Sequence, residues 1–183
     1  MKQAMMIPAF NEESVLQELF ARLQAATEPI GKRFTFEYLF INDGSHDSTL
    51  EIIKKLRGKN PSTSFVSLSR NFGKEAAMLA AFDHVNSDTT TTIDADLQDP
   101  PELIPQMLDY WQQGYDYVCA RRKERRGKGW IKKITARRKR LTLNRQDTKE
   151  KPSTWDGISL APHTGHAPSN RGKTRQMRHC RLL

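Results

Sequence analysis

The sequence has little of what marks secreted, membrane-spanning or metal-cluster proteins. Its two cysteines, Cys119 and Cys180, are too few for a disulfide framework or a cysteine metal site. No apolar run approaches the length that spans a bilayer, and the longest covers only residues 76–82. The N-terminus leads directly into a strand-like segment without a secretory signal. We therefore expect a cytoplasmic protein, free or peripheral on the inner face of the cell membrane, with no transmembrane segment in this chain.

Apolar residues are also scarce, and charge is unevenly distributed. Hydrophobic residues make up 37% of the 183, and the mean hydropathy is −0.71. Residues 1–120 hold 10 Lys and Arg against 17 Asp and Glu, a net −7, whereas residues 121–183 hold 20 against 4, a net +16. Such asymmetry indicates a basic tail or a surface for anionic partners. No nucleic-acid partner is expected, because no recognition motif or aromatic stacking pattern accompanies the basic residues.

The first part of the chain alternates strand-like apolar runs with helix-like periodic segments. We expect strands at 3–9, 36–41, 64–68, 89–93 and 115–120, and helices at 12–26, 47–56, 73–85 and 100–111. Asn11 is placed to cap the first helix, and Pro105 can kink the last. The order of elements predicts an α/β fold with a mostly parallel sheet flanked by helices.

The domain boundary is expected near residue 135. Residues 1–135 carry the alternating elements. Residues 136–183 are rich in Arg, Lys, Thr, Ser, Pro and His and show no sustained period. Because this composition buries little apolar surface, we expect a disordered basic tail there.

Four polar segments follow four of the predicted strands, at residues 8–12, 43–45, 70–74 and 94–98. In open parallel sheets, ligands bind beyond the carboxyl ends of the strands, so these segments predict a binding site. Asp94 and Asp96, two residues apart, can converge on one Mg²⁺ or Mn²⁺ ion, although a solvated acidic loop is the ordinary reading of such a pair.

Four charged side chains near this predicted site stay open to two interpretations. Asp43 is either a turn residue or an acceptor for a base or ribose. Lys74 is either a surface lysine or part of a phosphate-binding helix start. Arg121, with Arg122 beside it, follows the fifth predicted strand, where Arg can give paired donors to phosphate oxygens or simply lie in solvent.

Taken together, these segments resemble the family-2 glycosyltransferases that act on polyprenyl phosphates. The resemblance covers the chain to about residue 133 and is carried by five stretches: IPAFNEE (7–13), FINDGSHDST (40–49), LSRNFGKEAAMLAAF (68–82), TIDADLQDPPELIP (92–105) and YDYVCARRKERRG (115–127). It implies a GT-A (Rossmann-like) fold and a Mg²⁺ or Mn²⁺ cofactor. It also implies inverting transfer of a hexose, glucose by overall likeness, from a UDP-sugar to polyprenyl (bactoprenol) phosphate at the membrane surface.

The family pattern also implies roles for individual residues. The uridine pocket would be lined by Pro8, Phe10, Glu12, Ile41 and Asp43. The donor and metal would be held at residues 94–98, with Asp94 and Ala95 on the donor, Asp94 and Asp96 as catalytic carboxylates, and Asp94, Asp96 and Gln98 toward the metal. Diphosphate or lipid phosphate would be held by Arg121 and Arg122.

The family's acceptor-side motif of the G-D-F-R-L type and its C-terminal transmembrane helices are not found here. Residues 155–160 can be encoded so that a shifted frame reads Gly-Met-Gly-Phe-Arg, close to that motif. We therefore hypothesise a frameshifted tail, which unrelated codons in every frame of the gene would contradict. Three functions stay open: an active glycosyltransferase, a truncated and inactive UDP-sugar-binding remnant, and a basic nucleic-acid binder. The sequence does not indicate an oligomeric state.

Overall fold

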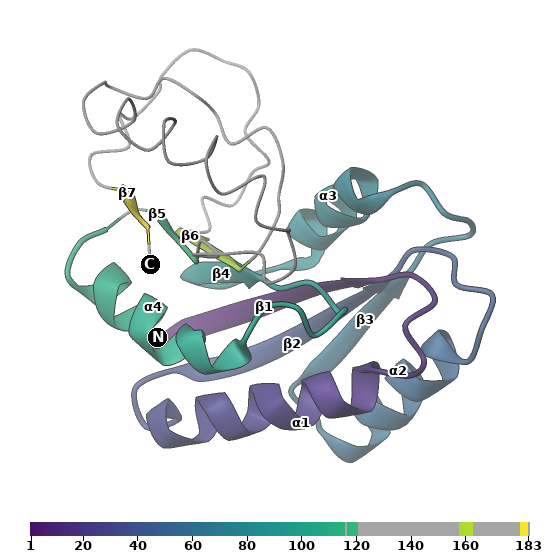
Figure 1. Ribbon diagram of the computed structural model, residues 1–183, viewed down its shortest axis with the longest axis horizontal. Helices are drawn as coiled ribbons and strands as arrows, with labels where there is room; N and C mark the ends of the chain where they lie inside the picture. Colours follow the sequence, from purple (N-terminus) through teal and green to yellow (C-terminus); the bar gives the residue numbers. More distant parts are fainter. Residues whose placement is uncertain (116, 121–157, 163–179, 183) are drawn as a thin grey trace, which may run out of the picture. The chain divides into compact units, whose positions relative to one another are not determined.

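The computed structural model describes residues 1–115, 117–120, 158–162 and 180–182, all of which belong to one compact unit (Figure 1). The strands are β1 (Lys2–Ala9), β2 (Thr35–Asn42), β3 (Thr63–Ser67), β4 (Thr89–Thr92), β5 (Tyr117–Cys119), β6 (Ser159–Pro162) and β7 (Cys180–Leu182). The helices are α1 (Leu16–Thr27), α2 (Thr49–Lys59), α3 (Lys74–His84) and α4 (Ile104–Gln112), with short 3₁₀ turns η1 (Glu28–Ile30) and η2 (Pro101–Leu103).

The strands form one sheet in the order β3-β2-β1-β4-β6-β5-β7. The first four strands of this order are parallel, with Met6 of β1 paired with Leu39 of β2 and Thr92 of β4. β6 runs antiparallel to β4 and β5, and β7 runs parallel to β5. The α/β prediction with a mostly parallel sheet is therefore confirmed.

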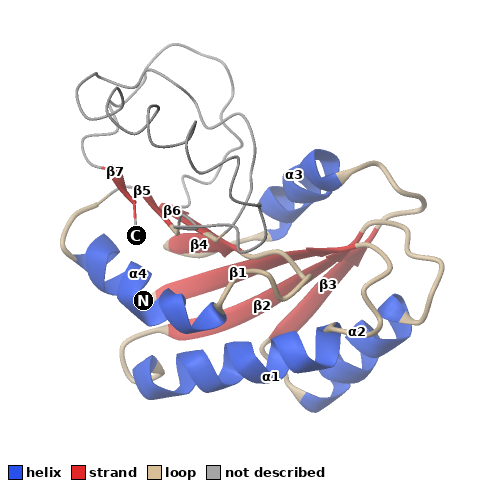
Figure 2. Cartoon of the chain, viewed as in Figure 1, coloured by secondary structure: helices blue, strands red, loops and turns tan. Residues whose placement is uncertain are grey.

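Helices cover both faces of the parallel strands (Figure 2). α1, α2 and α4 pack on one face through apolar residues at helical spacing, such as Leu19 and Leu23 of α1, against Phe40 of β2. α3 packs on the other face, where Met78 lies in a second core cluster with Met6. β1 is buried on both faces after the exposed Lys2, which explains the apolar run from Ala4 to Ala9. None of the described helices is long and apolar enough to span a bilayer.

Two local expectations were wrong at helix starts. Asn11 does not cap α1, whose N-cap is Val15, because Asn11 adopts a left-handed backbone (φ 57°) in the loop before the helix. Pro105 does not kink a helix. The chain after Pro100 forms the turn η2 first, and α4 begins at Ile104, so Pro105 occupies the first turn, where its missing N–H is not needed.

Most of the predicted tail, residues 136–183, and the predicted boundary near residue 135 lie outside the described residues. The structure differs from the expectation of disorder in two short segments, which form β6 and β7. Ile158 and Leu160 are buried in the same core cluster as β1 and α1. Two inward-facing residues separated by one position are too short a pattern to reveal a strand in the sequence.

Candidate functional site

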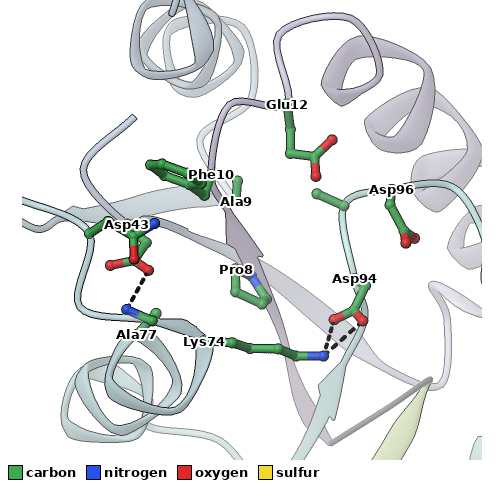
Figure 3. A pocket seen from close by; sticks show the side chains of 12 residues that line it. Pro8, Ala9, Phe10, Glu12, Asp43, Lys74, Ala77, Asp94 and Asp96 are labelled. Carbon is green, nitrogen blue, oxygen red and sulfur yellow. Dashed lines mark hydrogen bonds and ion pairs between the residues drawn. The ribbon is translucent and has the colours of Figure 1, made fainter. Parts of the chain in front are cut away.

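A cavity of about 290 Å³ opens at the carboxyl ends of the parallel strands (Figure 3). It is built by the loops after β1, β2, β3 and β4, which are the four polar segments singled out in the sequence. Its lining consists of Pro8, Ala9, Phe10, Glu12, Asp43, Asn71, Gly73, Lys74, Ala77, Asp94, Ala95 and Asp96. Neighbouring parallel strands end at the same edge, so residues distant in the sequence meet there.

The loop after β1 is fastened to the loop after β2 by side chain–backbone hydrogen bonds. The Asn11 backbone N–H donates to Ser45 Oγ at 3.0 Å, and the His46 N–H donates to Asn11 Oδ1 at 2.9 Å. The Glu12 N–H donates to Thr49 Oγ1 at 2.8 Å. These bonds hold Phe10 and Glu12 at the cavity wall, which is a positioning role for Asn11.

Asp43 is buried and binds the loop that follows β3. Its Oδ1 accepts the Phe72 N–H at 2.8 Å and its Oδ2 accepts the Gly73 N–H at 2.9 Å. Gly44 has φ +68°, and a Cβ there would lie 2.6 Å from Arg70 Cα, so only glycine fits this close approach. The Asp43–Gly44 turn thus fixes where the β3–α3 loop and the start of α3 lie.

Lys74, the first residue of α3, forms an ion pair with Asp94 across the cavity (Figure 3). Its Nζ lies 2.7 Å from Oδ1 and 2.8 Å from Oδ2. Burial raises the pKa of Asp94 above its ordinary value, while the hydrogen bond and charge of Lys74 act in the opposite direction. The sequence left Lys74 open between a surface role and a site role, and the structure places it in the site.

Glu12 and Asp96 add two more carboxylates to the cavity. Burial raises the pKa of Glu12, and nearby negative charges, Asp96 first among them, raise it further. Asp96 is exposed, and its Oδ1 accepts the Gln98 N–H at 3.0 Å in a turn where Leu97 has φ 58°. The negative charges of Asp96 and Asp94, which raise the pKa of Glu12, also make the cavity favourable for a cation.

The residues present fit a divalent cation whose ligands come partly from the protein and partly from a bound substrate. Oδ1 of Asp94 is buried and receives no well-directed hydrogen bond from the described residues, although the Lys74 amine is near. The described residues contain no group of three His, Cys, Asp or Glu side chains that could hold a metal by themselves. Mg²⁺ sites commonly use one or two carboxylates with substrate phosphates, and Asp96 with Asp94 can supply these.

Most of the predicted site residues that the structure describes line the cavity. These are Pro8, Phe10, Glu12, Asp43, Asp94, Ala95 and Asp96. Ile41 does not, because its side chain is buried in the core cluster beneath α3. Gln98 does not line the cavity, but its backbone N–H donates a hydrogen bond to Asp96 Oδ1, which does line it. Arg121 and Arg122 lie outside the described residues.

Four further residues line the cavity although no individual role was predicted for them from the sequence: Ala9, Asn71, Gly73 and Ala77. Ala9 and Gly73 leave space in the cavity and carry no reactive group, so a search for motifs of reactive side chains does not reveal them. The signal for Asn71 and Gly73 was their place in the polar segment at 70–74, after a predicted strand.

The sequence matches the profile "Glycosyl transferase family 2" over residues 5–175. The chain belongs to this family. It is 42% identical over 154 residues to an uncharacterized glycosyltransferase of Synechocystis, covering 84% of this chain and 48% of that protein. It is 41% identical over 136 residues to the bactoprenol glucosyl transferase of Shigella phage SfV, covering 74% of this chain and 44% of that protein. The chain thus spans less than half the length of these relatives.

Solved structures share the fold. S. aureus TarS in complex with UDP superposes with a TM-score of 0.58 at 24% identity, covering 70% of this chain and 38% of that one. Glucosyl-3-phosphoglycerate synthase from Mycobacterium tuberculosis, in complex with Mn²⁺, UDP and phosphoglyceric acid, gives a TM-score of 0.57 at 19% identity, covering 88% and 56%. The fold of the described unit is therefore GT-A-like.

Proposed function

We propose that the cavity binds a UDP-sugar together with Mg²⁺ or Mn²⁺. The sugar of this donor, a hexose that we propose to be glucose, is transferred to polyprenyl phosphate. The observation that carries the proposal is the convergence of Asp94, Asp96 and Glu12 on one cavity at the carboxyl edge of a parallel sheet. The similarity to the bactoprenol glucosyl transferase of Shigella phage SfV supports the acceptor class, and the solved relatives with UDP and Mn²⁺ support the donor class.

Each loop of the cavity has a role in this proposal. The loop after β1 would line the uridine pocket with Pro8, Phe10 and Glu12. Asp43 would meet the base while continuing to hold the loop after β3, since each carboxylate oxygen can accept more than one hydrogen bond. Ala95 would lie against the donor, where its small side chain leaves room for the sugar.

The diphosphate end of the donor would lie at the loop after β4. Asp94 and Asp96 would hold the divalent ion, which supplies charge neutralisation for the departing diphosphate. Gln98 supports Asp96 through the N–H that it donates. Arg121 and Arg122, outside the described residues, would hold diphosphate or the lipid phosphate.

The proposed reaction is an inverting transfer. An oxygen of the acceptor phosphate attacks the anomeric carbon, the bond from that carbon to the UDP oxygen breaks, and UDP leaves with the electron pair. The acceptor phosphate is already ionised near neutral pH, so little help from a general base is needed. The side chains described here therefore serve to orient the donor and to balance charge. Because the proposed acceptor is a lipid, the reaction would take place at the inner face of the cell membrane.

The test is transfer of labelled glucose from UDP-glucose to undecaprenyl phosphate in detergent, with Asp96→Ala as the control. Metal-dependent formation of labelled lipid that Asp96→Ala abolishes is the expected result. UDP binding without transfer would instead support the second candidate function, a protein that binds UDP-sugar but does not transfer the sugar to an acceptor. A folded chain that neither binds UDP nor transfers glucose would contradict both.

A further inference from the structure

The ion pair of Lys74 with Asp94 places a positive charge beside the carboxylate that a divalent cation in this cavity would use as a ligand. One amine faces both oxygens of Asp94, at 2.7 and 2.8 Å (Figure 3). The two side chains are 35% and 26% exposed, so water screens their charges less than those of an open surface pair. A metal ion approaching Asp94 must therefore displace this amine or bind beside it.

The position of Lys74 is set by the backbone that carries it. The two residues before it, Phe72 and Gly73, are held through their N–H groups by Asp43. The same loop is pressed against Gly44, whose place tolerates no side chain. The start of α3 is thus fixed relative to β2, and the amine has a defined starting point from which to reach Asp94.

The charges of the cavity favour a metal only when it comes with a further anion. Glu12, Asp94 and Asp96 carry negative charge, and Lys74 offsets part of it at Asp94. A lone divalent ion at Asp94 would lie a few ångströms from the ammonium and be repelled by it. A nucleoside diphosphate brings oxygens that can accept from the amine and coordinate the ion, so it can replace Asp94 as the partner of Lys74.

We propose that Lys74 is a counter-ion that keeps Asp94 from divalent cations until a nucleoside diphosphate offers the amine another partner. Metal binding at this cavity then depends on the nucleotide, and metal and donor enter together. This inference rests on the donor class given under Proposed function. In the loaded state Lys74 donates to diphosphate oxygens, and both oxygens of Asp94 face the cation. A merely structural ion pair would contribute to stability and leave metal affinity unchanged.

The test is a Mn²⁺ titration of the full chain, followed by the electron paramagnetic resonance signal of free Mn²⁺, with and without UDP. Wild type is expected to bind Mn²⁺ about tenfold more tightly with UDP than without it. Lys74→Met is expected to bind Mn²⁺ about tenfold more tightly than wild type when UDP is absent, so that the gain from UDP shrinks.

Lys54→Met is the matched control. Lys54 forms an ion pair with Glu51 at 3.3 Å on the exposed surface of α2, so the substitution removes the same charge and a similar contact away from the cavity. Its Mn²⁺ affinity is expected to equal that of wild type. The double variant Lys74→Met/Asp94→Asn is expected to lose the gain seen in Lys74→Met, because the carboxylate that was released is gone.

Two different failures can be told apart. If wild type binds UDP with Mn²⁺ but Lys74→Met and wild type bind Mn²⁺ equally in the absence of UDP, the counter-ion role is overturned and the proposed function stands. If wild type, folded by circular dichroism, binds UDP neither with nor without Mn²⁺, the proposed function and this inference both fall. Lys74→Gln replaces Lys74→Met if the latter does not fold, and the same gain is expected of it.

Discussion

The two parts of the sheet are assembled in different ways. β1 to β4 come from the first 92 residues, each joined to the next through a helix, and they pair in parallel over as many as eight residues. β5, β6 and β7 are three or four residues long and come from segments about 40 and 20 residues apart. All four loops that line the cavity follow the first group of strands.

Because of this difference, we expect the binding of the sugar donor to depend on only one of the two groups of strands. The donor side is built from local β-α units whose loops meet because their strands are parallel neighbours. The described residues that line the cavity all lie at the ends of β1 to β4, in the loops after them, or at the start of α3. We therefore expect donor binding to depend on β1 to β4 and their loops, and we expect β5, β6 and β7 to contribute to stability.

The largest expected effect is the loss of an aromatic ring from the core of the parallel strands. Phe40 of β2 is fully buried, and its ring centroid lies 6.0 Å from that of Phe20 in α1. Phe40→Ala is expected to lower the free energy of unfolding by about 3–5 kcal/mol, measured by chemical denaturation. Leu79→Ala, at a position 56% exposed on α3, serves as the control and should change it by less than about 0.5 kcal/mol.

Leu160 tests whether β6 contributes to the same core. Its side chain is fully buried, in the cluster that also contains Phe40. Leu160→Ala is expected to cost about 2–4 kcal/mol of stability while UDP affinity, measured below the unfolding temperature, stays at the wild-type value. Unchanged stability would show that β6 does not support the core, and lost UDP binding in a folded variant would contradict the expectation that donor binding depends on β1 to β4 and their loops.

Gly44 tests the link between the loops of the donor side. Gly44→Ala combines a left-handed backbone with a clash against Arg70, so a loss of roughly 1–3 kcal/mol is expected, with a weakening of UDP binding as the start of α3 shifts. Gly58→Ala is the matched control, since nothing lies within 4 Å of a Cβ at that helical position. It should stabilise the protein by about 0.5–1 kcal/mol and leave UDP binding unchanged.

The smallest expected effect is at the surface pair of Arg22 and Glu102, which links α1 to η2. Two hydrogen bonds, at 3.0 and 2.9 Å, join the side chains, and the bond from Arg22 lowers the pKa of Glu102 below its ordinary 4.5. Because the folded pKa is the lower one, the pair stabilises the fold above about pH 4.5 and the contribution is lost as pH falls through the folded pKa.

Glu102→Gln isolates that contribution. The pair is exposed, so the variant should lose no more than about 1 kcal/mol near neutral pH and nothing at strongly acidic pH, measured by denaturation across pH. A difference between wild type and Glu102→Gln that grows as pH falls would contradict the assignment of the lowered pKa to this contact.

Much of the fold and of the site could be predicted because both depend on local patterns. The runs at 3–9, 36–41, 64–68 and 89–93 match β1 to β4 within about two residues, since they combine apolar or β-branched residues and stop at turn residues; the last of them is four threonines and Ile93. The rule that ligands lie beyond the carboxyl ends of parallel strands then located the cavity loops.

The remainder depended on contacts between distant residues. The partner of Lys74 is 20 residues away, so a lysine at a helix start could not be told from a solvated one. Asn11 has the residue type of a helix cap, but its bonds to Ser45 and His46, more than 30 residues away, give it a different role. Leu160 lies in a strand whose partners, β4 and β5, are 40 or more residues earlier.

We propose that the loops after β1 to β4 form a metal-dependent site for a nucleoside diphosphate. Calorimetric titration of the full chain with UDP, with and without Mn²⁺, tests it most directly when repeated for Asp96→Ala. We expect binding that requires Mn²⁺ and that Asp96→Ala abolishes. Absence of binding to a chain shown to be folded, or binding that is the same in Asp96→Ala, would contradict it.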